Sequence, residues 1–430
     1  MKNYGNIKAE IEGLFIVITF ILLTVHDYLF NSLLFDTPLY YLAGWKDFIV
    51  LAFLFYLLIS IMYSSILFGK ISRKDYLFFK LLILFILIAL VGLISGTLNN
   101  LSNYRFYFLI TFFSGTFSFV LSNNINTNSK YFELGLILST LLIVFYGYFQ
   151  YVTISIPNDF WYWDHFIDLG FDPNFWDVFR EGRPRISSFF TSSLDYSLYL
   201  LVTFSILLSF AHLNYQEKKF LKFFFYLTFL IVVFHSIYLS TVRSALIGSV
   251  GVLFLFLVYL ACRNTKTLVF FSILIFLGLS TSTFLYIILG FTDELSALGR
   301  IPQWINFLQL IKEHWIIGLG IANIGPKGEY WFDSFWINYF LSFGIVLGFV
   351  IVAIFIKLYF IVIKKLSFRS DKLVIIFYLP IYIITPIFFY LFFFQSFTRT
   401  PAIYLFVILF YVVSYLENRQ VYLQDKIKIK

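Results

Sequence analysis

The chain has little charge and almost no sulfur. Only 13% of its 430 residues are Asp, Glu, Lys or Arg, whereas a soluble domain carries about 25%. Because 60% of the residues are hydrophobic, no soluble fold could hide this much apolar surface. The one cysteine, Cys262, excludes an intramolecular disulfide and a thiolate metal cluster. The sequence therefore predicts an integral membrane protein.

Several motifs that are typical of nucleotide-binding proteins and metalloenzymes are also missing. The sequence contains neither a Walker A nor a dinucleotide-binding glycine loop, and its five histidines never take a metal-ligand spacing such as HExxH. We therefore expect no metal, no cofactor and no direct use of cytosolic ATP or nucleotide sugars. The net charge of +8 lies in loops that face anionic lipid, so it does not indicate a nucleic-acid partner.

Long apolar runs recur along the whole chain. Runs of about 20 residues match the thickness of a bilayer core, and we count about twelve. The first run, from Leu14 to Leu23, lacks a small-residue cleavage site, which predicts a span and not a removed signal peptide. The prediction is an all-α polytopic protein with one transmembrane domain, residues 1–430. The predicted spans are 12–30, 46–68, 76–98, 105–122, 132–155, 187–211, 221–241, 244–262, 268–291, 333–360, 373–396 and 401–416.

Alternate loops carry the positive charge. Of the 31 Lys and Arg residues, 21 fall on one side and 10 on the other. The positive-inside rule then places both termini in the cytoplasm. The predicted outer set is Lys46, Arg105, Arg180, Arg183, Arg185, Arg243, Arg300, Lys312, Lys327 and Arg399.

Arginine dominates this outer set, although basic residues are normally scarce there. Seven of the 11 arginines belong to it, with only three lysines. Arginine presents a planar fork that grips phosphate with two parallel hydrogen bonds, whereas lysine is a mobile point charge. The distribution indicates an anionic, phosphorylated substrate on the outer face.

Two predicted outer loops are long, 156–186 and 292–332, and long loops in a compact chain are usually functional. The first mixes aromatic residues, acids and arginines. Aromatic faces pack on sugar rings and carboxylates accept from sugar hydroxyls, although an interfacial aromatic belt also explains the tryptophans. Its residues of interest are Trp161, Trp163, Trp176, Asp159, Asp164, Asp168, Asp172, Asp177, Arg180, Arg183 and Arg185.

A short predicted outer turn, Leu239 to Gly248, contains Arg243 between two apolar spans. Arginine there is costly unless it reaches water or a partner. Ser240, Thr241 and Ser244 are expected to cap the following helix, whose dipole would add positive potential. The alternative is an arginine that snorkels to the interface.

The second loop predicts an amphipathic helix after Arg300 that lies along the membrane surface and includes His314 near its end. Gly318, Gly320 and Gly325 follow, and their free N–H groups are expected to offer an anion site. Asp333 then stands where a span begins. A carboxylate there is functional by default, or it is the N-cap of that span.

Taken in order, seven segments resemble the O-antigen polymerase and ligase superfamily, the Wzy and WaaL type. They are WKD at 45–47, Arg105, PRISSFF at 184–190, TVRSALIG at 241–248, LGRIPQW at 298–304, HWIIGLGIANIG at 314–325 and DSFWINYFLSFG at 333–344. The resemblance implies a GT-C-like fold and a metal-independent glycosyltransferase whose donor is a glycan on undecaprenyl diphosphate.

The resemblance also implies roles for individual residues. Arg300 and Arg243 match arginines thought to hold the diphosphate, with Arg183 or Arg185 a further match. Ligases carry a histidine followed by Asn or Ser, then nine residues and a glycine, at the last span entrance. Here Asp333 replaces that histidine and Leu347 replaces a second glycine three residues after Gly344, which favours a polymerase.

The leading hypothesis is therefore a polymerase in the bacterial plasma membrane that joins lipid-linked repeat units into O-antigen, capsule or exopolysaccharide. A chain-length regulator and a flippase are the expected protein partners. Three alternatives remain: a ligase that transfers the glycan to a lipid, protein or wall acceptor, a flippase or exporter of lipid-linked oligosaccharide, and a membrane scaffold. The expected site consists of Asp333 and Arg300 as catalytic residues, with Arg243, Arg183, Arg185, Arg105, Trp163 and His314 binding substrate.

Overall fold

A computed structural model gives the fold of the chain. It describes residues 2–35, 37–52, 55, 59, 62, 113, 125–163, 167, 178–180, 182–262, 264–288, 299–320, 323–324, 330, 332–366, 375, 379–380 and 382–383.

Helices dominate this part of the chain, as the all-α prediction requires. The only strands in the described ranges form one two-residue antiparallel hairpin. In chain order the elements are α1 (Lys2–Tyr28), the π-helical η1 (Leu29–Leu33), the 3-10 helix η2 (Pro38–Gly44), α5 (Ile125–Thr153), the 3-10 turn η4 (Pro157–Asp159), β1 (Phe179–Arg180), β2 (Arg183–Pro184), α8 (Ser193–Gln216), α9 (Phe220–Leu239), α10 (Arg243–Ala261), α11 (Thr265–Ile288), α13 (Arg300–Glu313) and α14 (Phe335–Leu366).

Five helices are long and apolar enough to cross a membrane: Glu10–Leu33, Ser129–Thr153, Ser193–Gln216, Phe220–Leu239 and Arg243–Ala261. They coincide with five predicted spans, which confirms a membrane-embedded helical protein. Helices α11 and α14 occupy two more predicted spans, 268–291 and 333–360. The spans predicted at 76–98 and 401–416 lie outside the described residues, as do most of 46–68, 105–122 and 373–396, so the total of twelve stays a prediction.

Helix α8 forms the centre of the bundle. In its most apolar stretch 94% of the residues are buried, against 33% for the neighbouring α9. Two buried hydroxyl groups of this helix have hydrogen-bond partners, because Ser205 and Ser209 donate to backbone carbonyls one turn earlier, at 3.0 and 3.2 Å. Their small size lets neighbouring helices approach closely, as in other membrane bundles.

One span begins later than predicted. The sequence predicted a span from residue 187, but α8 starts only at Ser193, with Ser192 as its N-cap. Ser188 has a left-handed backbone (φ 55°), which a continuing helix cannot contain. The preceding motif, PRISSFF, therefore forms a buried turn before the helix and not its first two turns.

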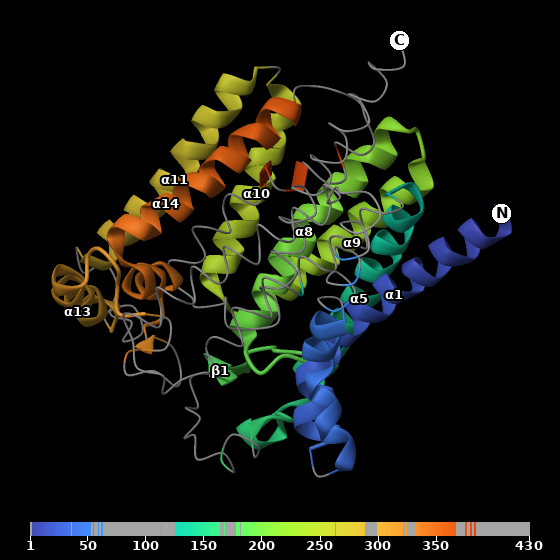
Figure 1. The fold of residues 1–430 in the computed structure, drawn as a ribbon, viewed down its shortest axis with the longest axis horizontal. Helices are drawn as coiled ribbons and strands as arrows, with labels where there is room; N and C mark the ends of the chain where they lie inside the picture. The colour runs from blue at the N-terminus through green and yellow to red at the C-terminus, as the bar shows by residue number, and fades with distance from the viewer. Residues whose placement is uncertain are drawn as a thin grey trace.

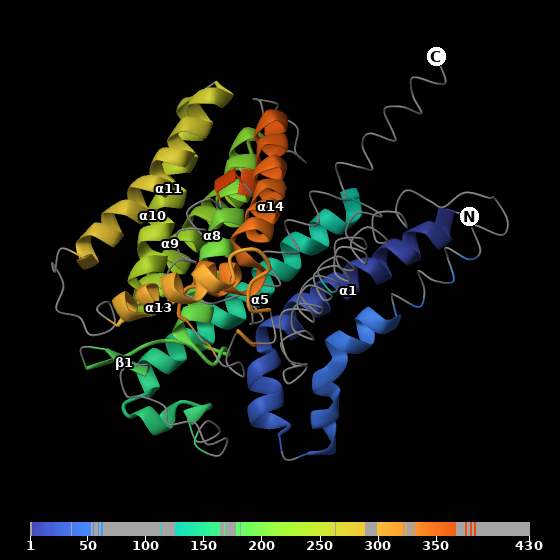
Figure 2. The same cartoon turned by 60° about the vertical axis from the view of Figure 1, so that its left-hand side comes forward.

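The helices run back and forth between two ends of the molecule. Figures 1 and 2 show η1, η4, the β1–β2 hairpin and α13 towards the lower end, which we call the site end. The α8–α9 and α10–α11 turns lie at the upper end (Figures 1 and 2). The predicted inner residues Lys218 and Lys219 thus lie at the opposite end from the described parts of the predicted outer loops, and which side of a membrane each end faces stays a prediction.

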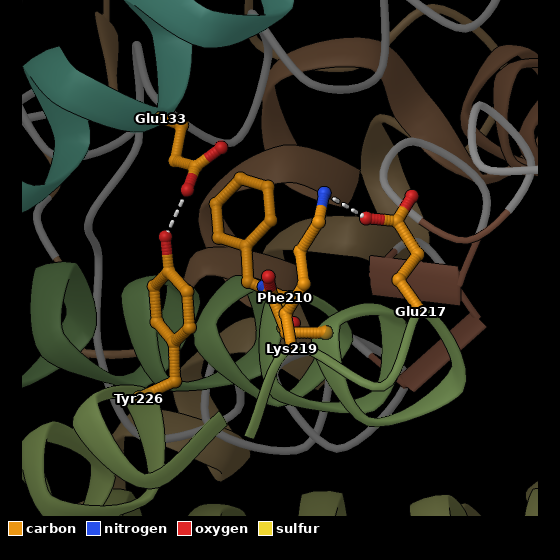
Figure 3. Close-up of polar contacts among 6 residues, drawn as sticks. Glu133, Phe210, Glu217, Lys219 and Tyr226 are labelled. Atoms are coloured by element: carbon orange, nitrogen blue, oxygen red, sulfur yellow. Dashed lines mark hydrogen bonds and ion pairs between the residues drawn. The ribbon is translucent and has the colours of Figure 1, made fainter. Parts of the chain in front are cut away.

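At the end opposite the site, one polar contact ties α5 to α9. Figure 3 shows the Tyr226 hydroxyl pointing at the Glu133 carboxylate, to which it donates a hydrogen bond. In the adjacent turn, Lys219 pairs with Glu217 at 2.6 Å. A carboxylate near a span end is stabilised when a neighbouring helix supplies a donor, so this contact fixes the two helices relative to each other.

Candidate functional site

The amphipathic helix predicted after Arg300 exists as α13, and part of its apolar side packs against α14. Trp304, Phe307 and Ile311 pack into a cluster with Ile337 and Leu341 of α14. Ile305, Leu308 and Trp315 stay exposed, so the placing of this segment along the membrane surface stays a prediction. The start of α14 offers an apolar partner, and burying side chains against it removes them from water as effectively as lipid would. Figure 2 shows α13 crossing the lower end of α14.

Asp333 is held at the junction between these two helices. The Gln303 side-chain amide donates to Asp333 Oδ2 at 3.0 Å, and its carbonyl oxygen accepts from the Asp333 backbone N–H at 3.0 Å. Asp333 itself is exposed. The N-cap alternative is wrong, because the hydroxyl of Ser334 accepts from the N–H of Ile337 at 3.5 Å and occupies the capping position of α14.

A second amide secures the backbone beside Asp333. The buried Asn338 side chain accepts from the Phe332 N–H at 3.2 Å and donates to the Phe332 carbonyl. The residue before Asp333 is thus clamped on both of its backbone polar groups. Gln303 therefore contacts Asp333 itself, and Asn338 fixes the backbone of the residue before it.

Arg300 begins α13 and shares a helix face with Gln303. Residues three apart on a helix are neighbours, so the guanidinium starts from the same side of α13 as the amide that holds Asp333. No side chain caps this end: the N-cap residue is Gly299, and the first turn contains no acid. Arg300 thus lies one helical turn before the residue that contacts Asp333, and a shared site for Arg300 and Asp333 stays a prediction.

Arg243 also begins a helix, α10, and that end is likewise uncapped by a side chain. The expectation that Ser240, Thr241 or Ser244 caps α10 is wrong, since Val242 occupies the N-cap position. Thr241 adopts a left-handed conformation (φ 55°), and Ser240 bonds to the Ile237 carbonyl at 2.6 Å. A cation at a helix N-terminus is electrostatically unfavourable by roughly 0.3–1 kcal/mol unless an anion joins it.

Arg183 and Arg185 are placed by a hairpin that the sequence did not predict. Strand β1 pairs with β2, with Arg180 opposite Arg183 and Gly182 at the turn (φ 72°). The Arg185 N–H continues the pairing by donating to the Val178 carbonyl at 2.7 Å. Arg183 is exposed and Arg185 is half-buried. The hairpin therefore presents arginines at the site end (Figure 1).

The motif after the hairpin anchors it in the bundle. Gln150 of α5 accepts from the Ser188 N–H at 2.6 Å and donates to the Ser188 carbonyl at 3.1 Å. Trp161 donates to the same carbonyl at 3.1 Å. Ser187 and Ser188 are both fully buried. The serines of PRISSFF are thus structural, and they fix where the neighbouring arginines emerge.

The first long loop is partly structural as well. Trp163 is half-buried against an apolar cluster that contains Phe160, Tyr162 and Phe179. Asp159 accepts from the N–H groups of Ser155 and Ile156 at 2.9 and 3.0 Å, and these backbone hydrogen bonds lower the pKa of its carboxyl group. Asp159 therefore caps a turn. The acids Asp164, Asp168, Asp172 and Asp177 lie outside the described residues, as does Trp176.

Helix α14 breaks at Gly344, which has φ 76° and ψ 168°. An intact helix would join the carbonyls of Leu341 and Ser342 to the N–H groups four residues later. Here the segment after α13 supplies the partners. Leu319 N–H donates to the Leu341 carbonyl at 2.6 Å, and Gly320 N–H donates to the Ser342 carbonyl at 3.1 Å.

The same segment also satisfies the donors beyond the break. The Trp315 carbonyl accepts from the Ile345 N–H at 2.7 Å and from the Val346 N–H at 3.3 Å. The Gly318 N–H donates to the His314 carbonyl at 2.9 Å. The predicted anion site at the glycine N–H groups is therefore wrong for Gly318 and Gly320, because these donors are already used. Gly325 lies outside the described residues.

Two predicted site residues remain, His314 and Arg105. His314 is half-buried and ends α13, where its carbonyl supports the turn to Gly318. Arg105 lies outside the described residues. Within the described residues, Asp333 contacts Gln303 of α13, three residues after Arg300. Arg183 and Arg185 lie at the β1–β2 hairpin, and Arg243 begins α10.

Three amide side chains were missed by the sequence analysis: Gln150, Gln303 and Asn338. Two of them interrupt predicted apolar spans, Gln150 in 132–155 and Asn338 in 333–360. An amide in such a span needs internal partners, so these positions did contain a signal. Gln303 had a weaker one, its place one helical turn after Arg300.

Comparisons with protein-family models, with curated proteins and with solved structures find no match to this chain.

The break in α14 predicts an unusual sensitivity to single methyl groups. A Cβ atom at Gly318 would lie 2.4 Å from the Gly344 nitrogen, and one at Gly344 would lie 2.6 Å from the Ile316 carbonyl carbon. Both glycines also have positive φ. We expect Gly318→Ala and Gly344→Ala each to lower the melting temperature of the detergent-purified protein by several degrees, since backbone cannot move aside.

The matched control is Gly278→Ala in α11, where an added Cβ meets nothing within 4 Å. Alanine is the better helix former by about 1 kcal/mol, so this variant should be as stable as the parent or slightly more stable. Unchanged melting of both Gly318→Ala and Gly344→Ala would contradict the backbone crossing.

Proposed function

We propose that the protein is a polysaccharide polymerase of the plasma membrane, a metal-independent glycosyltransferase acting on undecaprenyl-diphosphate-linked repeat units at the outer face. The observation that carries the proposal is the α13–α14 junction, where an exposed carboxylate, Asp333, is fixed by Gln303 on the helix face that begins with Arg300. A base and a cation held at one place suit the displacement of an anionic leaving group.

The proposed reaction first requires stabilisation of the negative charge that develops on the leaving group. The acceptor hydroxyl oxygen forms a bond to the anomeric carbon of the donor glycan, and the bond from that carbon to the diphosphate oxygen breaks. Negative charge grows on the leaving undecaprenyl diphosphate. Arg300 and Arg243 begin helices without side-chain caps, so guanidinium and helix dipole together favour an anion at each end.

The acceptor hydroxyl must also lose a proton. In the proposal Asp333 takes it, since a carboxylate within hydrogen-bond reach of the hydroxyl serves as a general base. Direct displacement by the acceptor inverts the configuration at the anomeric carbon. Arg183, Arg185 and Arg105 would contact the phosphates or sugars further from the bond that breaks, and Trp163 and His314 would contact the sugars.

A ligase that passes the glycan to a lipid, protein or wall acceptor is the second candidate. The site chemistry is the same, and Asp333 in place of a histidine is what favours polymerisation. A flippase for lipid-linked oligosaccharide would need charged side chains along a route within the spans. In the described ranges the basic residues gather at the two ends of the bundle.

Deletion of the gene separates these candidates. A polymerase mutant should attach a single repeat unit to its final acceptor, so the glycan ladder on a gel collapses to one band. A ligase mutant should leave long polymer on its lipid carrier. A flippase mutant should accumulate single lipid-linked repeats on the cytoplasmic side, and an unchanged ladder would refute all three assignments.

The arginine forks can be tested without removing charge. We expect Arg300→Lys and Arg243→Lys to abolish polymer at normal protein level, because lysine keeps the charge but cannot form two parallel hydrogen bonds to phosphate. The measurement is the glycan ladder of the complemented deletion strain. Lys312→Arg, at the far end of α13, serves as the control and should leave the ladder unchanged. Normal-length polymer from both arginine variants would show that diphosphate binding does not depend on these forks.

The base role of Asp333 has its own test. Asn in place of Asp333 can still accept from Gln303 and keeps the same backbone N–H, so the geometry should survive while the charge is lost. We expect Asp333→Asn to lower polymer formation by about a hundredfold or more with unchanged melting temperature. Full polymer from this variant would exclude Asp333 as the base and direct attention to His314 or to two other acids of the predicted outer loop 292–332, Asp293 and Glu294.

A further inference from the structure

We propose that Gln303 is a positioning residue for the reaction, which aims the Asp333 carboxylate at the acceptor hydroxyl. This inference rests on the proposed function and adds to it a residue that acts through Asp333 and does not itself touch the substrate. The motivating feature is the two-point contact between one amide side chain and one aspartate.

The orientation of the Gln303 amide is fixed by the backbone. Its Oε1 accepts from the Asp333 N–H at 3.0 Å, and a backbone N–H can only donate. The end of the amide that faces this N–H must therefore be its oxygen, Oε1, and the amide nitrogen, Nε2, faces the carboxylate. Nε2 donates to Oδ2 at 3.0 Å. The amide thus holds Asp333 by its main chain and by its side chain at once.

This contact divides the two carboxylate oxygens between two tasks. Oδ2 is engaged by Gln303, whereas in the described part of the chain Oδ1 has no hydrogen-bond partner, and Asp333 is exposed. Oδ1 is then the oxygen offered to an acceptor hydroxyl. A carboxylate free to rotate would present either oxygen in many directions, and a misplacement of about 1 Å costs up to a hundredfold in rate.

A purely structural tie between α13 and α14 does not account for the contact. The two helices already share an apolar cluster that includes Trp304, Phe307 and Ile311. The backbone of residues 315–320 is hydrogen-bonded across the break in α14 as well. Against these contacts, one partly exposed amide adds little to the attachment of α13. Its effect is local to the orientation of Asp333.

The test compares two substitutions that both remove the donor to Oδ2 but differ in whether an acceptor for the Asp333 N–H remains. Gln303→Met fills the same space and loses both hydrogen bonds. Gln303→Glu keeps an oxygen for the Asp333 N–H and loses the donor to Oδ2, so it preserves the tie to the main chain and places two carboxylates face to face. We expect both variants to lower polymer formation in the complemented deletion strain by about tenfold or more, with the melting temperature within a few degrees of the parent.

Gln309→Met is the matched control, because Gln309 is an exposed glutamine on the same helix. It should give a normal ladder. Normal polymer from Gln303→Glu would overturn the positioning role and leave only a main-chain anchor. Normal polymer from Gln303→Met would exclude both. If Asp333→Asn is fully active, the base hypothesis itself fails. If Asp333→Asn is inactive while Gln303→Met is normal, only the present inference fails.

Discussion

The arrangement of the site depends on one backbone crossing, between residues 315–320 and the broken helix α14. Inside a bilayer every backbone polar group needs an internal partner, so a helix can break only where another segment supplies donors and acceptors. Leu319, Gly320 and Trp315 do this for the two hydrogen bonds that α14 loses around Gly344. Gly318 and Gly344 permit the approach, because no side chain fits between the two chains.

The crossing also sets the position of α13. Residue 315 lies two residues after the end of this helix, so α13 cannot slide along α14 without breaking the bonds at the crossing. Its apolar face then packs on the first turns of α14, which brings Gln303 to Asp333 at the entrance of that helix. A glycine break deep in one helix thus determines where a polar pair stands at the end of the bundle.

Spans were predictable from the sequence because they depend on local hydropathy, and five predicted spans coincide with long apolar helices. Motif order alone predicted a site that includes Arg300 and Asp333, and the structure gives Asp333 a contact with Gln303, three residues after Arg300. The hairpin at Arg183 and the late start of α8 were not predicted, since both depend on buried hydrogen bonds from Gln150, a residue 38 positions from Ser188. Amide partners that meet only in three dimensions leave little trace in a single sequence.

A neutral partner for Asp333 fits the proposed chemistry better than a charged one would. An arginine bound to the carboxylate would neutralise the charge that the base needs. That arginine would also be unavailable to bind the diphosphate. Gln303 orients Asp333 through hydrogen bonds without adding charge. The first residues of α10 and α13 remain the cationic positions, reinforced by uncapped helix ends. In the proposed mechanism, an amide can therefore orient the base without competing with the diphosphate for an arginine.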